Sequence, residues 1–262
     1  MKPASSVIDT RGLQSPIAWR DRPIVEVHNL TKMYRLGEHQ SLRGTLKAMT
    51  GGRPERQTLL ALNDVSFSIA RGECFGIVGA NGSGKSTLLQ VISQITLPTA
   101  GYAIVRGRVL PLLAVGTGFH PELTGRENVV LFGTVLGFQR RAILERMDDI
   151  IAFAEIGLHI DTPLKRYSSG IQARLSFAVA MMFPAAISIF DEVLAVTDDE
   201  FTARSIRSIE SIISDGRTAI FVSHDAGLVR ELCDRVMWLE HGEVRLIGPP
   251  AEVMDAYHAA HS

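Results

Sequence analysis

The feature that most constrains the fold is a glycine-rich segment, Gly79–Ser86, set between a short apolar run and a helical pattern. The run reads ECFGIVG and predicts a buried strand, while the apolar spacing from Lys85 to Ile95 predicts a helix. The segment itself, GANGSGKS, fits G-x-x-x-x-G-K-[ST], which marks a phosphate-binding loop when a strand precedes it and a helix follows. This chain meets both conditions, so we predict that it binds a nucleotide.

Each residue type in this loop has a separate chemical task. Glycines let the backbone curl so that successive N–H groups converge on phosphate oxygens, and the following helix turns its positive end toward the same anion. The Lys85 side chain adds a positive charge for the β- and γ-phosphates, and the Ser86 hydroxyl can ligate Mg²⁺. The residues predicted to hold the nucleotide here are Gly79, Ala80, Asn81, Gly82, Ser83, Gly84, Lys85, Ser86 and Thr87.

Strand and helix patterns alternate along the chain and predict an α/β fold. Beyond Pro184, apolar runs such as AAISIF alternate with helical stretches such as FTARSIRSIESII, which is typical of a parallel sheet covered on both faces. Glu127–Ala154 is helical in spacing, with a break at Gly137. Residues 1–22 are polar and predict a loosely held tail. Arg35–Gln57 predicts either a solvated surface hairpin or a contact surface for a partner or for anionic lipid headgroups.

Composition excludes several classes of protein. The 27 Lys and Arg residues are balanced by 28 Asp and Glu, whereas a protein that binds nucleic-acid phosphates carries a basic excess. Only two cysteines are present, Cys74 and Cys233, too few for a disulfide framework, and their apolar surroundings predict core residues. The longest apolar stretch, Leu175–Phe190, is too short to span a bilayer, and the N-terminus lacks the apolar region of a signal peptide. We therefore expect a soluble protein of a reducing compartment.

Two further strands end in chemically useful side chains. The run AAISIF delivers Asp191 and Glu192 at the end of a sheet strand, where α/β proteins place their ligands. Asp191 can hold the Mg²⁺ shell, and Glu192 can accept a proton from the attacking water. The run AIFV ends in Ser223-His224-Asp225, so His224 could reach the γ-phosphate from the same sheet edge. The sequence thus predicts hydrolysis as well as binding.

In this order, these elements resemble an ATP-binding-cassette ATPase. The discriminating element is the sequence YSSGIQARL at Tyr167–Leu175, which stands in the position of that family's signature, commonly L-S-G-G-Q. The Y-S-S-G variant resembles the ATPase subunits of polysaccharide exporters, those for O-antigen, capsule and teichoic acid. GTGFHPELTGREN at Gly116–Asn128 and DEVLAVTD at Asp191–Asp198 resemble the same group, and the resemblance runs from Ile24 to Tyr257.

The resemblance implies a fold and a mechanism. The fold is a RecA-like P-loop core with a parallel sheet, an antiparallel β subdomain and an inserted helical lobe at about residues 117–183, all within an ATPase domain of residues 23–262. Two copies pack head-to-tail, so that each ATP lies between one phosphate-binding loop and the other copy's signature. Ser168, Ser169 and Gly170 open a helix whose N–H groups suit the opposite γ-phosphate. Asp198 links the two sites, and Tyr34 matches the aromatic that stacks on adenine.

The resemblance also implies partners and shows departures. The expected cofactors are ATP and Mg²⁺. The expected partners are a second ATPase subunit and integral membrane permease subunits, two copies of each, at the cytoplasmic face of the inner membrane, with the glycan contacted only indirectly. The family's usual Mg²⁺-contacting glutamine has no counterpart at Ala114 or Val115, and Thr197 stands where similar exporters have Gly. Since 38 residues follow His224, we expect a short form without the carbohydrate-binding domain that some relatives append, and export without recognition of a modified glycan end.

Other functions remain open at this stage. A related ATPase could export a lipid or a drug, although the signature variant argues against it. A non-transport cassette protein could act on DNA or ribosomes, but the separation of Lys85 from Ser168 leaves no room for a long coiled coil, and only one cassette is present. A GTPase or kinase with the same loop would lack the Tyr167–Leu175 element.

Overall fold

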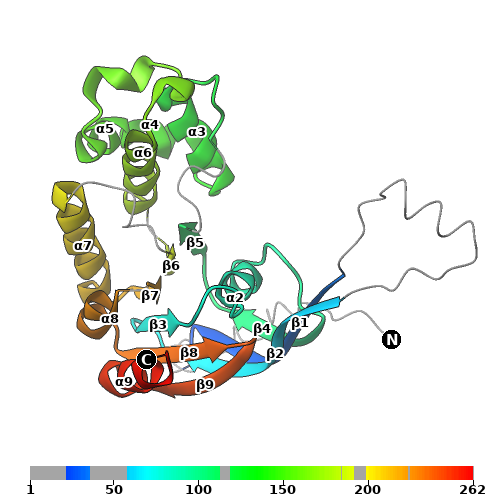
Figure 1. Cartoon of the computed structure of the whole chain (residues 1–262). Coiled ribbons are helices and arrows are strands. Elements are labelled where there is room, and N and C mark those ends of the chain that lie inside the picture. Colours follow the sequence, from blue (N-terminus) through cyan, green and yellow to red (C-terminus); the bar gives the residue numbers. More distant parts are fainter. Residues whose placement is uncertain are drawn as a thin grey trace, which may run out of the picture.

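The structure is a computed structural model that describes residues 22–35, 58–112, 119–183, 185–191, 199–223 and 225–261. Apart from Arg22, the predicted tail lies outside these residues, as does the predicted excursion beyond Arg35. The strands form two sheets, and a group of helices lies to one side of them (Figure 1).

The smaller sheet is antiparallel, with strand order β2-β1-β4. Its strands are β1 (Val25–Arg35), β2 (Thr58–Ile69) and β4 (Ala100–Val105). The start of β1 alternates buried and half-buried residues, the pattern of a strand with one face on a core. The pairing of β1 with β2 shifts register three times, between Val27 and Met33, and beyond these shifts Tyr34 pairs with Leu59.

The larger sheet has six strands in the order β5-β6-β7-β3-β8-β9. They are β5 (Val109–Leu112), β6 (Ile187–Asp191), β7 (Thr218–Val222), β3 (Cys74–Val78), β8 (Arg235–Glu240) and β9 (Glu243–Gly248). All neighbours pair parallel except β8 and β9, which form an antiparallel pair. The predicted α/β fold with a parallel sheet is confirmed, and every residue of β3 and β7 is buried because helices and strands cover both faces.

Helices cover the two faces of this sheet differently. On one side, α2 (Lys85–Ile92) shares a core cluster with β1, β2 and the large sheet. On the other side lie α7 (Asp199–Ser214), α8 (Ala226–Leu232) and α9 (Pro250–His261). Helix α2 ends at Ile92 rather than at the predicted Ile95, because Gln94 adopts a left-handed backbone with φ of 59°.

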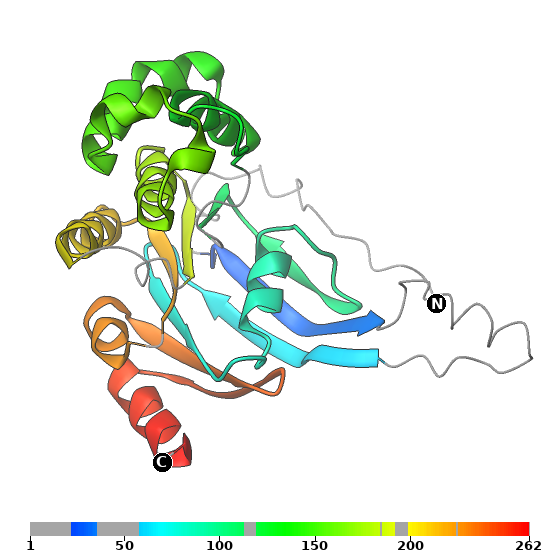
Figure 2. The same cartoon turned by 45° about the horizontal axis from the view of Figure 1, so that its top comes forward.

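The remaining helices gather into one lobe, drawn in green in Figures 1 and 2. It holds α3 (Gly125–Val135), α4 (Arg140–Glu145), α5 (Met147–Ala154), short 3₁₀ turns at Gly157–Asp161 and Leu164–Arg166, and α6 (Ser169–Met181). The predicted break at Gly137 is confirmed, and a second interruption occurs at Arg146. Helix α3 begins before the predicted Glu127, because Thr124 and Glu127 form a reciprocal capping box.

No helix within the described ranges is both long enough and apolar enough to cross a bilayer.

Candidate functional site

A cavity of about 430 Å³ opens where the glycine-rich loop meets both sheets. The loop follows β3, and three parallel strands end at this edge, since Asp191 pairs with Val222 and Ile77 pairs with Val222 from the other side. The residues that line the cavity are Tyr34, Leu59, Leu60, Ala61, Asn81, Gly82, Gly84, Lys85, Ser86, Thr87 and Asp191. The structure thus brings together the predicted loop, the predicted metal ligand and the predicted adenine contact.

Two loop glycines occupy places that no other residue fits. Gly79 has φ of 154°, and a Cβ there would lie 2.2 Å from the Leu239 carbonyl oxygen. Gly84 has φ of 109°, and a Cβ there would lie 2.5 Å from the Ala61 carbonyl oxygen. Glycine at these positions therefore allows both the left-handed backbone and the close approach of neighbouring strands.

Lys85 lies across the loop. Its side chain is only 8% exposed, and its ammonium donates hydrogen bonds to the carbonyl oxygens of Gly79 at 2.6 Å and Ala80 at 3.1 Å. These bonds hold a positive charge at the centre of the curled backbone. Beside it, the Ser83 hydroxyl is buried and has no hydrogen-bond partner among the described residues, so the loop has unused polar capacity facing inward.

Ser86 and Asp191 supply oxygen ligands from two elements. Ser86 lies in the first turn of α2, Asp191 is the last residue of β6, and both line the cavity. A hydroxyl and a carboxylate are the hard oxygen donors that Mg²⁺ prefers when phosphates complete its shell. Within the described ranges no group of three or more His, Cys, Asp or Glu side chains could hold a metal by itself. The pairing of the Ser86 hydroxyl with the Asp191 carboxylate fits a cation that phosphate oxygens also bind.

Tyr34 lies near the end of β1, where it lines the cavity. Its ring is half-buried with the Lys32 ammonium 4.9 Å from the ring centroid, and its hydroxyl donates to Gln90 Oε1 at 3.4 Å. Lys32 is itself held by hydrogen bonds to the Thr96 hydroxyl and the Leu97 carbonyl. These contacts fix a flat aromatic surface beside the loop.

Sequence reasoning missed the apolar residues that β2 adds next to Tyr34. Leu59 and Leu60 line the cavity although they are 51% and 44% exposed. The available signal was the run LLAL at residues 59–62, which places two adjacent leucines at a strand end, where one must face away from the core.

The signature residues lie in the helical lobe and do not line this cavity. Ser168 caps α6, with its hydroxyl accepting a hydrogen bond from the Ile171 N–H at 3.3 Å, and both Ser168 and Ser169 are exposed. The predicted helix opening at Ser168–Gly170 is confirmed. Gln172 donates to the carbonyls of Leu164 and Tyr167, so the chain before α6 is tied to its first turn.

Tyr167 anchors the same end of α6. Its side chain is buried, and its hydroxyl donates to the His159 carbonyl. Burial raises the pKa of Tyr167 above its ordinary value, so the phenol stays neutral. A Cβ at Gly125 would lie 2.4 Å from this hydroxyl. Glycine at this position therefore allows the start of α3 to lie close to Tyr167, the first residue of the signature.

Glu192, Asp198 and His224 lie outside the described residues, as do Ala114, Val115 and Thr197. The roles assigned to them from the sequence stay predictions. The position of β7 is nevertheless informative, because Val222 ends opposite Asp191 and the chain continues from there toward His224.

The two cysteines are core residues, as predicted. Cys74 and Cys233 are buried and free, with their sulfurs 4.0 Å apart. The hydrogen bond with Cys233 and burial raise the pKa of Cys74 far above its usual range.

Comparisons with known proteins agree on the kind of chain this is. A family model described as "ABC transporter" matches residues 62–195. The O-antigen export system ATP-binding protein RfbB of Klebsiella pneumoniae is 40% identical over 245 residues, which are 91% of this chain and 98% of that protein. The teichoic acids export ATP-binding protein TagH of Lactococcus lactis is 38% identical over 234 residues, 89% of this chain and 50% of that protein. Among solved structures, the dimer of the ATP-binding cassette MJ0796 bound to ADP and Pi is similar with a TM-score of 0.68 and 24% identity, covering 86% of this chain and 98% of that one.

Proposed function

Because this chain belongs to the ABC transporter family, we propose that it is the ATP-hydrolysing subunit of an exporter for a polysaccharide or lipid-linked glycan. The observation that carries the proposal is the single cavity that gathers the loop around Lys85, the carboxylate of Asp191 and the ring of Tyr34. Residues 23–262 then form one ATPase domain, with a helical lobe at about 117–183.

Nucleotide binding follows from the loop. The N–H groups at the start of α2 and in the curled loop donate to phosphate oxygens, and Lys85 exchanges its carbonyl contacts with Gly79 and Ala80 for the β- and γ-phosphates. Tyr34 presents its ring to the adenine, with Leu59 adding apolar contact. Ser86 and Asp191 hold Mg²⁺, which neutralises charge on the phosphates when it is bound.

Hydrolysis is assigned to two residues beyond the described strands. Glu192 follows Asp191 directly and accepts a proton from the attacking water. His224 follows the end of β7 and orients the γ-phosphate. The parallel pairing of β6 with β7 supports this arrangement, because both strands end at the edge where the cavity opens.

A second copy completes the site. The N-terminal end of α6, with Ser168, Ser169 and Gly170, does not line the cavity of its own chain. The Ser168 hydroxyl caps the Ile171 N–H, so the N–H groups of Ser169 and Gly170 are the ones offered to an anion. In a head-to-tail pair it faces the γ-phosphate held by the partner's loop, and Asp198 links the two sites. Hydrolysis removes the γ-phosphate and reopens the pair, which pulls on the membrane subunits.

The substrate class comes from the relatives. Proteins named for O-antigen and teichoic acid export are about 40% identical to this chain over most of its length. We infer that two ATPase subunits work with two membrane permease subunits at the cytoplasmic face of the inner membrane, and that the glycan is not touched directly. The coupling near Ala114 and Val115 proceeds without the glutamine usual in the family.

The test is the Glu192→Gln variant, measured by light scattering after gel filtration and by phosphate release. We expect it to bind ATP, to stop turnover and to run as a dimer with ATP but as a monomer without it. Lys85→Ala is the companion variant and loses ATP affinity. Turnover at the native rate in Glu192→Gln, or unchanged affinity in Lys85→Ala, would overturn the roles given to these residues.

A further inference from the structure

One carboxylate links the helical lobe to the core helix α7. Glu155 ends α5, where it adopts a left-handed backbone with φ of 55°. Its Oε2 lies 3.1 Å from a guanidinium nitrogen of Arg174 on α6, and its Oε1 accepts a hydrogen bond from Arg204 on α7. Each of the three side chains is less than half exposed, so these charge-assisted bonds are partly shielded from water.

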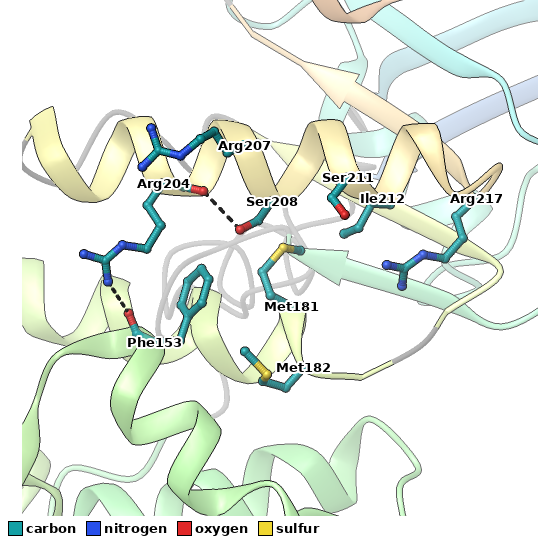
Figure 3. A pocket seen from close by; sticks show the side chains of 9 residues that line it. All are labelled: Phe153, Met181, Met182, Arg204, Arg207, Ser208, Ser211, Ile212 and Arg217. Atoms are coloured by element: carbon teal, nitrogen blue, oxygen red, sulfur yellow. Dashed lines mark hydrogen bonds between the residues drawn. The ribbon is translucent and has the colours of Figure 1, made fainter.

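Arg204 also forms a second hydrogen bond to the helical lobe. A second nitrogen of its guanidinium donates to the Phe153 carbonyl at 3.2 Å (Figure 3). That carbonyl belongs to the last turn of α5, whose oxygens have no partner within the helix. A single side chain of α7 therefore binds both the end of α5 and the residue that follows it.

We call the contacts of Glu155 and Arg204 described above the clamp. Next to it, α5, α6 and α7 each contribute one aromatic ring. Phe153, Phe177 and Phe201 have ring centroids 5.8 to 6.0 Å apart, and the Arg174 guanidinium lies 5.2 Å from the Phe201 centroid. Ring pairs of this kind stabilise the packing of the three helices. The Glu155 carboxylate adds directed, charge-assisted bonds to the same contact.

The contacts of Arg204 lie at the edge of a cavity between α6 and α7. This cavity, of about 370 Å³, is lined by Phe153 and Arg204 and extends to Met181 and Met182 at the end of α6 and to Ser208 and Ser211 of α7 (Figure 3). The bonds of Glu155 and Arg204 therefore join α5, α6 and α7 beside a region where side chains do not fill the space between the helices. Elsewhere in the lobe, the ion pairs among described residues join lobe residues to one another, as Arg126 joins Asp161.

The two helices joined in this way carry two parts of the proposed interface. Helix α6 begins at the signature, with Ser168 as its cap, and α7 begins at Asp199, directly after Asp198 in the chain. We propose that Glu155 is a positioning residue, which bridges Arg174 and Arg204 so that the signature and the start of α7 keep one spacing. The inference rests on the proposed function, because only a composite site requires both parts to meet the partner's nucleotide together.

The test compares Glu155→Gln with Glu145→Gln, a matched change in an exposed ion pair with Arg141 inside the lobe. Both are made in the Glu192→Gln background, and ATP-driven dimerisation is measured at a series of protein concentrations. We expect Glu155→Gln to weaken dimerisation about fivefold to tenfold while nucleotide affinity of the dilute monomer stays unchanged. Glu145→Gln should match the parent, since exposed pairs of this type contribute little.

A second measurement reads the clamp directly. Spin labels are placed at Leu158→Cys, which is 95% exposed in the native chain, and at Glu210→Cys on the exposed side of α7; the native cysteines are buried. The distance distribution between labels should be narrow in the parent and in Glu145→Gln and broader in Glu155→Gln. Arg204→Gln should broaden the distribution less when it is added to Glu155→Gln than when it is made in the parent, because the bond between Arg204 and Glu155 is already lost and only the bond to the Phe153 carbonyl remains to be removed.

The outcomes separate the two proposals. If the parent does not dimerise with ATP, the proposed function fails, and the label distances still decide the role of Glu155. If the parent dimerises but Glu155→Gln neither broadens the distances nor weakens dimerisation more than Glu145→Gln does, the positioning role is wrong. If Glu155→Gln has a markedly lower Tm by circular dichroism, Arg204→Lys takes its place. Lysine keeps the positive charge but lacks the two guanidinium nitrogens that reach Phe153 and Glu155 together. Unchanged label distances and unchanged dimerisation in Arg204→Lys would refute the clamp.

Discussion

Two glycines of the loop at Gly79–Ser86 offer a controlled test of how the loop is built. Gly82 and Gly84 both have positive φ, 81° and 109°, so alanine at either position meets the left-handed penalty of about 1–2 kcal/mol. They differ in space: nothing lies within 4 Å of a Cβ at Gly82, whereas a Cβ at Gly84 would lie 2.5 Å from the Ala61 carbonyl oxygen and 3.0 Å from Leu62 Cδ2. Overpacking of that kind costs a further ~1–3 kcal/mol.

The expected result is an ordered pair of stability losses. Gly82→Ala should lower the free energy of unfolding by about 1–2 kcal/mol, and Gly84→Ala by about 2–5 kcal/mol. At about 2–4 °C per kcal/mol, the Tm of Gly84→Ala should fall roughly twice as far or more. Thermal and urea unfolding of the nucleotide-free chain measure the loss of stability in each variant. If Gly82→Ala and Gly84→Ala lose the same stability, the contact between the loop and Ala61 is not the cause of the larger loss expected for Gly84→Ala.

Three more predictions concern the cavity, the buried cysteines of the core and the helical lobe. Tyr34→Ala should weaken ATP binding about fivefold or more while Tyr34→Phe leaves it unchanged, by isothermal calorimetry; equal affinities of all three forms would exclude stacking. Cys74 and Cys233 should not react with a thiol reagent until the chain unfolds, because burial and their mutual contact hold the thiol of Cys74 protonated, its pKa raised; prompt labelling of the native chain would contradict this. The pKa of Glu127 is lowered by hydrogen bonds from the backbone and hydroxyl of Thr124, so its stabilisation is present above its ordinary range near 4.3 and is lost as pH falls through the lowered value. Glu127→Gln should therefore lower Tm at pH 7 but much less at pH 3, in thermal melts across that range, and a constant difference would refute the cap as the cause.

Local pattern predicts the elements of this chain well. The strand at Cys74–Val78, the loop and the helix from Lys85 are all legible in the sequence, because a buried run, a glycine cluster and helical spacing each act over a few residues. The start of α3 is less legible. The apolar spacing alone placed the start of this helix at Glu127. Thr124 and Glu127 together form a helix-start signal, which places the start two residues earlier, at Gly125.

Contacts between distant segments are beyond such patterns. Leu59 lines the cavity beside Tyr34 because β1 and β2 pair in a register, with several shifts, that places these two residues opposite each other. Likewise, the residues around Glu155 and Glu145 do not show which of the two carboxylates meets arginines from other helices. Only packing of α5 against α6 and α7 puts one of them between two arginines.

The amino-acid sequence alone predicted the chemistry proposed for this protein: a phosphate-binding loop, a strand-end carboxylate and a signature that opens a helix. These depend on residue type and short spacing, which survive in any fold that keeps the local elements. The tertiary structure decided which side chains meet, gathering Tyr34, Lys85 and Asp191 at one cavity while holding Ser168 apart on the lobe. The physical reason is that sheet order, register and helix packing are set by long-range burial, to which each local segment contributes only a part.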